Sequence, residues 1–524
     1  MKTMMPLPLP ELDLAWTPMP GALPALHAEV GTAELLLVCR RVHDSGGRLV
    51  SLWGEDRRGG NGGSDGDGGY SLCVVLELGE RLLVVEHLMP SDTPSYPDLS
   101  AIFPGASRLQ RATFDLLGIR AVGGDARPWL RHDAWSANTF PLRCDAVIGA
   151  APEPEPYPFI RVEGDGVHEI AVGPIHAGTI EPGHFRFSVV GENVLRLEVR
   201  LGYAHKGIEK RFVGLTLADG IALAARVSGD STIAFAWAYA MAAEALTATQ
   251  VPPRALALRA LLLERERLAN HLGDIGGIGN DAGLAFGQMQ FSRLKEDLLR
   301  VNADVWAARY PMNALMPGGV HADLAPDGAQ RLLDSMASLE TELQVLRDIY
   351  DNHAGLQDRF MGAGCVTPAL ARQLGVVGLV ARASGQAQDW RASLRMPPYA
   401  PLLVTPVVRE AGDVAARVAV RFDEAVESLR LCRELLATLP VGPVRAPLGE
   451  VRGSELAIGG VEGWRGPVLV GLRASADGRI ARCHPHDPSW NNWPSIEHAI
   501  IGNIVADFPL INKSFNLAYS GHDL

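Results

Sequence analysis

The protein has 524 residues, of which 47% are hydrophobic and 21% charged, a globular balance that excludes fibrous and wholly disordered chains. Its 48 basic and 60 acidic residues give a net charge of −12 with no basic block, which argues against nucleic-acid binding. Length alone predicts about two to four domains. Its six cysteines are scattered without a CxxC pair, so no sequence-local cage for zinc or an iron–sulfur cluster is expected.

The first part of the chain predicts a small α+β domain. Residues 1–30 are proline-rich and expected to be irregular. Short apolar runs then predict strands at residues 34–42, 47–55, 70–78 and 81–88. The glycine-rich segment 57–70 is predicted to be a flexible hairpin insertion. A helix is expected at 107–117, and the proline-rich stretch 151–160 indicates a linker, so the domain is predicted to span 31–150.

The second part, 161–524, predicts a large and mainly helical domain with small β elements. Alternating runs indicate three strands between residues 168 and 202. Helical patterns follow, and the longest are listed here: 253–272, 327–352 and 413–439. Short strands at 453–482 and one closing helix at 492–508 complete the prediction. The apolar stretch 221–246 is interrupted by charges, so we expect a buried helix there and no membrane span. The N-terminus has prolines and acids where a signal peptide needs an apolar run, so export through it is not expected.

Several motifs then resemble one family. RLGYAHKGIEKRF (200–212) and ARVSGDSTIAFAWAYAMAAE (225–244) are similar to the large subunit of membrane-bound NiFe hydrogenases of the formate hydrogenlyase type. They are also similar to the homologous quinone-site subunit of respiratory complex I. FPGASRLQRATFDLLGI (103–119) resembles the small complex I subunit that is fused to the large one in formate hydrogenlyase. The resemblance implies the corresponding two-part fold.

The metal ligands that this family uses do not match. NiFe enzymes hold their metals with two CxxC pairs, because thiolates are the soft ligands that nickel and low-spin iron require. By the resemblance, the four positions are Ser228, Ser231, Ala518 and Gly521. We therefore expect no NiFe centre. Asp230 with the two serines offers hard oxygen ligands, which suit magnesium better than nickel. A hydrogenase with unorthodox ligands is the remaining alternative.

The quinone site of the complex I relatives is also only partly kept. Their hairpin histidine falls on Pro182 and their tyrosine on Gly229, which leaves His176 and His184 as candidate quinone contacts. Asp281 matches the aspartate that partners the missing histidine, and its alternative is a polar core group.

Glu209 matches a glutamate that passes protons in hydrogenases, and the alternative is a salt bridge with Lys206, Lys210 or Arg211.

Two further residues imply a partner. Arg186 and His271 match residues that face the iron–sulfur cluster of the adjacent small subunit, where they would raise its potential; His271 filling a helix interface is the alternative. The segment CHPHDP contains His484, His486 and Asp487, which form the densest local ligand cluster. A solvated turn is favoured there over a metal site.

These observations predict a subunit of a complex I-like or hydrogenase-related, membrane-associated oxidoreductase that lacks a NiFe centre. Its role would be electron transfer to a quinone or another acceptor, or the coupling of redox change to the membrane. A structural, non-catalytic subunit is the alternative. The expected partners are a small iron–sulfur subunit and proton-pumping membrane-arm subunits. The expected location is the cytoplasmic face of the cell membrane, with no transmembrane segment of its own.

Overall fold

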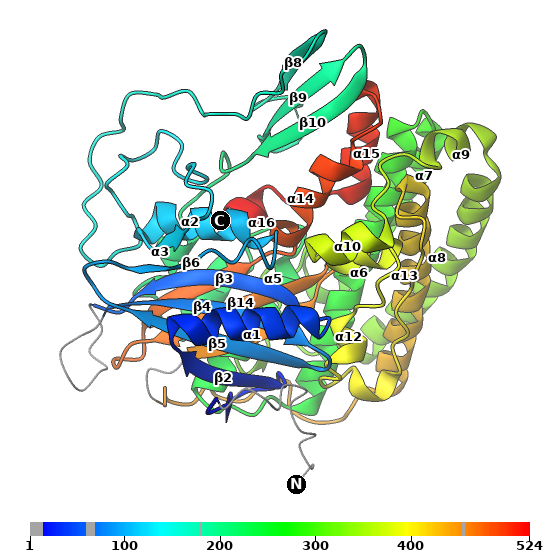
Figure 1. Ribbon diagram of the computed structural model, residues 1–524. Helices are drawn as coiled ribbons and strands as arrows, with labels where there is room; N and C mark the ends of the chain where they lie inside the picture. Colours follow the sequence, from blue (N-terminus) through cyan, green and yellow to red (C-terminus); the bar gives the residue numbers. More distant parts are fainter. Residues whose placement is uncertain (1–13, 59–68, 179, 453–455) are drawn as a thin grey trace.

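The computed structural model describes residues 14–58, 69–178, 180–452 and 456–524. Its N-terminal part is a five-stranded sheet in the order β1-β2-β5-β4-β3. The strands are β1 (Thr17–Pro18), β2 (Ala25–Val30), β3 (Arg48–Asp56), β4 (Tyr70–Leu78) and β5 (Arg81–Met89). β2 runs parallel to β5 and the other neighbours are antiparallel. Helix α1 (Thr32–Asp44) lies across one face of this sheet (Figure 1).

Two N-terminal predictions are wrong. Residues 34–42, expected to be a strand, lie inside α1, where Leu35, Val38, Cys39 and Val42 are buried. Their spacing of three and four residues is the helical period, which a short apolar run conceals. Glu34 also accepts a hydrogen bond from the backbone N–H of Gly31 at 2.7 Å and so caps the helix. Residues 25–30, expected to be irregular, form β2 because β5 supplies a parallel neighbour.

The predicted β3–β4 hairpin is confirmed, with Asp56 opposite Tyr70. Most of its glycine-rich insertion, residues 59–68, lies outside the described residues. Helix α2 (Ala106–Leu117) is also confirmed, and it is flanked by the paired short strands β6 (Ser95–Pro97) and β7 (Arg120–Val122).

A three-stranded antiparallel sheet follows the linker. It contains β8 (Val167–Val172), β9 (His184–Val190) and β10 (Asn193–Arg200) in the order β10-β9-β8. The sheet extends away from the rest of the molecule, next to α14 and α15 (Figure 1).

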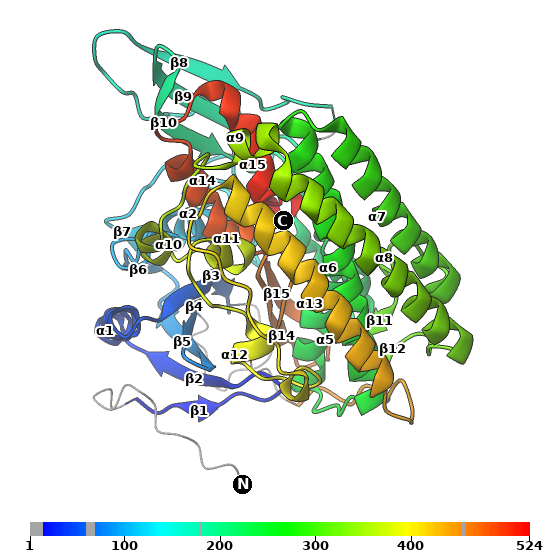
Figure 2. The same cartoon turned by 90° about the vertical axis from the view of Figure 1, so that its right-hand side faces the viewer.

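The centre of the molecule is helical. Four long helices lie side by side (Figure 2): α6 (Pro253–Asp281), α7 (Ala285–Trp306), α8 (Pro326–Asn352) and α13 (Val414–Ala437). Helix α5 (Thr232–Leu246) packs behind them and every one of its residues is buried, which is why it is apolar on all sides. Among the described residues, no helix is both long enough and apolar enough to cross a bilayer. Shorter elements complete this part: α3 (Ile208–Phe212), α4 (Leu217–Ala224), β11 (Leu315–Met316), β12 (Gly319–Val320), α9 (Ala354–Phe360), α10 (Pro368–Leu374), α11 (Gly378–Ala383) and α12 (Trp390–Ser393).

The C-terminal part returns to the centre of the molecule. Strands β13 (Leu456–Glu462), β14 (Pro467–Ala474) and β15 (Ile480–His486) form an antiparallel sheet. Arg473 of β14 binds Glu55 at 2.8 Å and Glu86 at 2.9 Å, which ties this sheet to the N-terminal one. The single closing helix predicted at 492–508 is wrong in extent. α14 (Ser489–Ala499) ends before Gly502, whose φ of +80° breaks the helix, and α15 (Phe508–Phe515) and α16 (Ser520–Asp523) follow.

Candidate functional site

The four positions that the sequence predicts to correspond to the family's metal ligands come together in space. Ser228 and Ser231 lie between α4 and α5, and Ala518 and Gly521 lie near the C-terminus. The hydroxyl of Ser520 donates to the carbonyl of Val227 at 3.0 Å, which joins the two segments. An ideal Cβ on Gly521 would lie 3.3 Å from Cβ of Ala518.

An ion pair lies between the two segments. Arg465, just after β13, donates to both carboxylate oxygens of Asp230 at 2.8 and 2.5 Å. The hydroxyls of Ser228 and Ser231 donate to the same carboxylate at 2.7 and 3.3 Å. Nε of Arg465 donates to the carbonyl of Asn516 at 2.6 Å, so the guanidinium bridges both segments. Burial opposes ionisation of Asp230, but Arg465 outweighs it and lowers the pKa of Asp230 to about 2.

A second carboxylate occupies the side-chain space of Gly521. The Cβ of any larger residue at this position would lie 2.3 Å from Oδ2 of Asp487, a contact that real Cβ atoms do not make. Asp487 also accepts the backbone N–H of Ser489 at 2.8 Å, and burial raises its pKa. Asp230, Asp487 and Arg465 therefore meet at the predicted metal-ligand positions.

Glu209 of α3 is buried and paired. Its Oε1 lies 2.7 Å from Nη2 of Arg482 and 2.7 Å from Nδ1 of His484. Burial would raise its pKa, but Arg482 and His484 outweigh it and lower the pKa to about 2. Glu209 is thus an ionised partner of Arg482, and the salt bridges considered from the sequence, with Lys206, Lys210 or Arg211, are not the ones it makes.

The CHPHDP segment is not the solvated turn that the sequence favoured. His484 and His486 lie on β15 and are buried, and their ring centroids are 6.3 Å apart on one side of the strand. His484 bonds Glu209 and also lies 3.2 Å from the hydroxyl of Ser51, while His486 bonds Asn491 at 2.9 Å. Among the described residues, groups of three potential metal ligands form only at Glu55–Cys73–Glu86 and Asp56–Cys144–Asp145, neither of which includes these histidines.

The β8–β9 hairpin brings a histidine to the C-terminal segment. The ring of His176 lies 6.3 Å from that of Tyr519, next to Ala518 in the chain. Gly183 allows this approach, because a Cβ there would lie 2.6 Å from Cε1 of Tyr519. Glu181 accepts the backbone N–H of Ser520 at 3.0 Å. His184 is buried and faces Phe159 at 5.0 Å, so of the two candidate histidines only His176 contacts the C-terminal segment.

The two residues expected to face a partner cluster lie in different surroundings. Arg186 is partly exposed on β9, binds Glu169 at 3.1 Å and lies over the ring of Phe159 at 4.6 Å. His271 has no exposed surface, and its Nε2 bonds Glu424 at 2.9 Å. A ring enclosed within its own chain does not fit a direct contact with a neighbouring subunit. Asp281 is the last residue of α6 and is exposed, which excludes a role as a core group.

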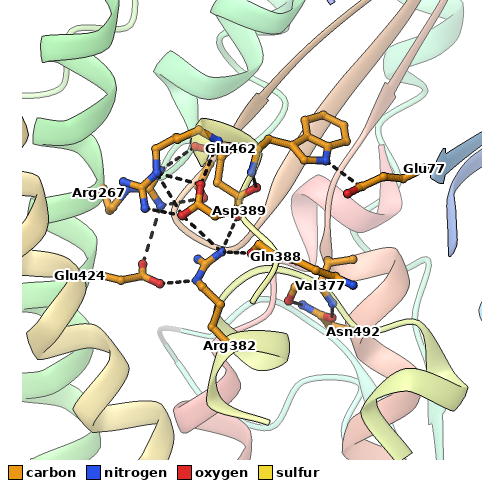
Figure 3. Close-up of polar contacts among 12 residues, drawn as sticks. Glu77, Arg267, Val377, Arg382, Gln388, Asp389, Glu424, Glu462 and Asn492 are labelled. Atoms are coloured by element: carbon orange, nitrogen blue, oxygen red, sulfur yellow. Dashed lines mark hydrogen bonds and ion pairs between the residues drawn. The ribbon is translucent and has the colours of Figure 1, made fainter. Parts of the chain in front are cut away.

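Through its bond to Glu424, His271 belongs to a buried ionic cluster, and Figure 3 shows the part of this cluster around Arg382. Arg382 binds Glu424 at 2.6 Å and Glu462 at 2.7 Å, and it lies 3.8 Å from Asp389. Further pairs extend the cluster: Arg267 with Glu264 and Glu424, and Arg391 with Asp389 and Glu264. The charged side chains are at most 2% exposed, so they hold α6, α11, α12, α13 and β13 in one fixed arrangement.

Sequence reasoning missed Arg465 and Tyr519. Arg465 lies more than 200 residues from Asp230, and only the fold brings them together. The neighbouring Trp464 also contacts Asp230 in the fold, because its indole N–H donates to the carbonyl of Asp230 at 3.0 Å. Tyr519 lies beside Ala518 in the sequence and carries no signal of its own, because Gly229 occupies the expected tyrosine position.

Comparison with known proteins shows the family and the fold. Residues 281–452 match the family model described as "Respiratory-chain NADH dehydrogenase, 49 Kd subunit", and residues 28–151 match that of the 30 Kd subunit. The chain is 32% identical over 493 residues to formate hydrogenlyase subunit 5 of Escherichia coli (strain K12), a match that covers 92% of this chain and 85% of that protein.

Two further relatives extend the comparison. The chain is 28% identical over 440 residues to the C/D subunit of NADH-quinone oxidoreductase from Phocaeicola vulgatus, covering 79% of this chain and 84% of that one. Its structure is similar to a chain of the membrane-bound sulfane sulfur reductase, an archaeal respiratory membrane complex. That match has a TM-score of 0.64 and 25% sequence identity, and covers 68% of this chain and 99% of the other.

Proposed function

The chain belongs to the family of subunits found in complex I-like and hydrogenase-related membrane oxidoreductases, and we propose that it has exchanged the family's NiFe centre for an internal ion pair. The observation that carries this proposal is the Asp230–Arg465 pair between Ser228–Ser231 and the C-terminal segment. The side chains at the four predicted ligand positions are two serine hydroxyls, the methyl group of Ala518 and the hydrogen of Gly521. None of them supplies the thiolate that nickel and low-spin iron require. The residues present therefore do not fit that metal centre.

The Asp230–Arg465 ion pair takes over part of the structural role of a metal ion, which is to hold the two segments together by a positive charge. A guanidinium is a fixed cation with several N–H donors, and it satisfies the carboxylate of Asp230 and the carbonyl of Asn516 together. Asp487 supports this interpretation, because its carboxylate takes the space of a fourth ligand at Gly521. These hydrogen bonds hold the C-terminal segment in place.

The test is the metal content of the complex purified from its native cell. We expect nickel below about one tenth of an equivalent per chain, with iron present in proportion to any iron–sulfur partner. About one nickel per chain together with hydrogen uptake would overturn the proposal. A nickel-containing hydrogenase purified in the same way is the control for metal loss during purification.

We further propose that the chain takes part in electron transfer to a quinone or a related acceptor, which would bind between the hairpin and the C-terminal segment. His176 and Tyr519 support this, because an imidazole and a phenol whose ring centroids are 6.3 Å apart can both bond one carbonyl oxygen of a quinone-like ring. Burial raises the pKa of Tyr519 to about 12, so its hydroxyl remains a donor at neutral pH. The partners in this role are a small iron–sulfur subunit and membrane-arm subunits at the cytoplasmic face of the membrane.

The matching experiment is quinone reduction by the native complex. Tyr519→Phe and His176→Ala should each lower kcat/KM at least tenfold, whereas His168→Ala on exposed β8 should not change it. Unchanged turnover in both variants, with the complex intact, would favour the alternative that this chain is a structural, non-catalytic subunit.

A further inference from the structure

A cavity lies beside the C-terminal part of α5, and neither Asp230 nor Arg465 lines it. Its volume is about 310 Å³, at the lower end of small-molecule pockets, which span roughly 300–1,000 Å³. It lies between Pro20–Ala22 of the N-terminal part, the end of α5 and the segment after α12. Its lining on α5 begins at Trp237, seven positions after Asp230, which is about 10 Å along the chain at the helical rise of 1.5 Å per residue, so the two sites are distinct.

The walls of this cavity are aromatic and apolar. Trp237 and Tyr399 line it, and their rings stack with centroids 6.3 Å apart and an interplanar angle of 26°. Met241 and Met396 add flexible apolar surface that adapts to a small ligand. The indole N–H of Trp237 is buried and has no acceptor among the described residues.

The polar groups of the cavity are mainly acidic. Glu244 and Glu462 line it together with one cation, Arg391, and Glu244 is itself paired with the buried Arg259 at 2.6 Å. Arg391 is already committed, because Nε and Nη2 donate to Asp389 and Nη1 donates to Glu264. Its charge is therefore already balanced by two carboxylates, which disfavours an anionic ligand.

Glu462 also belongs to the buried ionic cluster, part of which Figure 3 shows, and in this cluster carboxylates outnumber guanidiniums. The acids are Glu264, Asp389, Glu424 and Glu462, and the guanidiniums are those of Arg267, Arg382 and Arg391. The eighth member, His271, is disfavoured as a cation because burial lowers its pKa. The next buried guanidinium, Arg421, is paired with Asp274 at 2.9 Å. The cluster itself therefore has one negative charge too many unless a proton or another cation is present.

We propose that this cavity binds a small organic cation, a protonated amine with an apolar ring or chain. Aromatic faces beside carboxylates are the surroundings that stabilise ammonium groups, through cation–π attraction and charge-assisted hydrogen bonds. The ammonium group lies near Glu462, and the apolar part of the ligand lies against Trp237, Met241 and Met396. Such a ligand neutralises the surplus charge of the cluster and contacts both parts of the chain. The proposal is independent of the acceptor site proposed above.

The proposal also predicts competition with protons. Burial and the neighbouring Asp389 raise the pKa of Glu462, while Arg382 and Arg267 oppose the rise. Glu462 therefore holds a proton more readily than an ordinary carboxylate, and a bound ammonium group displaces that proton. Affinity for the amine should rise with pH while the amine itself remains protonated.

The experiment uses the full chain with its copurifying partners and three probes of nearly equal size: benzylamine, benzyl alcohol and benzoate. Calorimetric titration should show benzylamine binding at least tenfold more tightly than benzyl alcohol, and benzoate binding least. Equal or tighter binding of the alcohol or of benzoate overturns the proposal, and so does the absence of benzylamine binding at millimolar concentration.

Three variants locate the site. Met396→Trp fills the cavity and should lower benzylamine affinity at least tenfold. Trp237→Phe should lower it by a smaller factor, because phenylalanine is the weaker cation–π partner. Glu462→Gln resembles the protonated acid, so the chain should fold and lose both affinity and its dependence on pH. Glu198→Gln, a buried acid paired with Arg127 away from the cavity, is the control and should change nothing. Full affinity in Met396→Trp would place binding elsewhere and overturn the proposal.

Discussion

At the scale of single residues, the structure changes the role that the sequence suggests for Glu209. The sequence suggests a proton carrier, and a carrier at neutral pH works best with a pKa near 7. Its bond to Arg482 instead lowers the pKa of Glu209 to about 2. In this resting structure Glu209 is a fixed anion that holds α3 against β15. A role in proton transfer would need Arg482 to move away first.

This pair predicts how stability depends on pH. The folded-state pKa of Glu209 is lowered from its ordinary 4.5 to about 2, so its stabilisation is present above pH 4.5 and is lost as pH falls towards 2. Glu209→Gln should cost about 3 kcal/mol at pH 7, because it leaves Arg482 without its partner. The difference between wild type and variant should shrink between pH 4.5 and 2. Urea unfolding at a series of pH values measures it.

The control for this prediction is Glu155→Gln, an exposed carboxylate in the proline-rich linker, which should unfold like the wild type at every pH. A Glu209→Gln penalty that stays constant down to pH 2 would show that the loss arises from packing and not from the charge.

At the scale of elements, the two β-sheets approach each other closely through one glycine. Gly471 of β14 faces Trp53 of β3, and a Cβ at Gly471 would lie 2.5 Å from Cζ2 of that indole. The same indole stacks on His484 at 4.8 Å and donates to Glu55 at 3.0 Å. Trp53 therefore joins the N-terminal sheet to the strand that holds Glu209's partners.

We expect Gly471→Ala to destabilise the protein by about 1–3 kcal/mol, because neither the indole nor the backbone has room to move. Chemical denaturation measures this effect. Gly149→Ala is the matched control, since nothing lies within 4 Å of a Cβ there and its change should stay within about 0.5 kcal/mol. Equal effects at both glycines would refute the close sheet–sheet contact.

At the scale of the whole molecule, the β8–β10 sheet is the part best placed to meet another subunit. It extends from the body of the molecule, and Arg186 is partly exposed on it (Figure 1). The family relationship makes an iron–sulfur partner our proposal for this surface. His271 lies within the chain, so Arg186 carries this proposal alone.

The corresponding prediction is a redox titration of the complex. Arg186→Met should shift the partner cluster to a lower midpoint potential, because a nearby positive charge stabilises the more negative reduced cluster. Arg196→Met on β10 is the control, an arginine of the same sheet that is 38% exposed. An unchanged midpoint, or a complex without any iron–sulfur protein, would leave Arg186 with only its structural bond to Glu169.

Much of this protein follows from its sequence. The strands β3, β4 and β5 and the long helices α8 and α13 are predicted within a residue or two, because their hydrophobic periods are long and uninterrupted. The family and its two-part fold follow from motifs of local sequence. The domain boundaries at 31–150 and 161–524 remain a prediction. The sequence does not predict α1, because the apolar residues within 34–42 fit both the helical period and the strand period.

Only the tertiary structure decided which charges meet. Arg465 and Asp230, Arg482 and Glu209, and Tyr519 and His176 are each separated by more than two hundred residues. No local pattern marks such a pair, because its strength depends on distance and burial in the folded chain. The same holds for the acid-rich cluster around Glu462. Its members come from five elements. Arginine, aspartate and glutamate are usually exposed, and only the fold buries these side chains together.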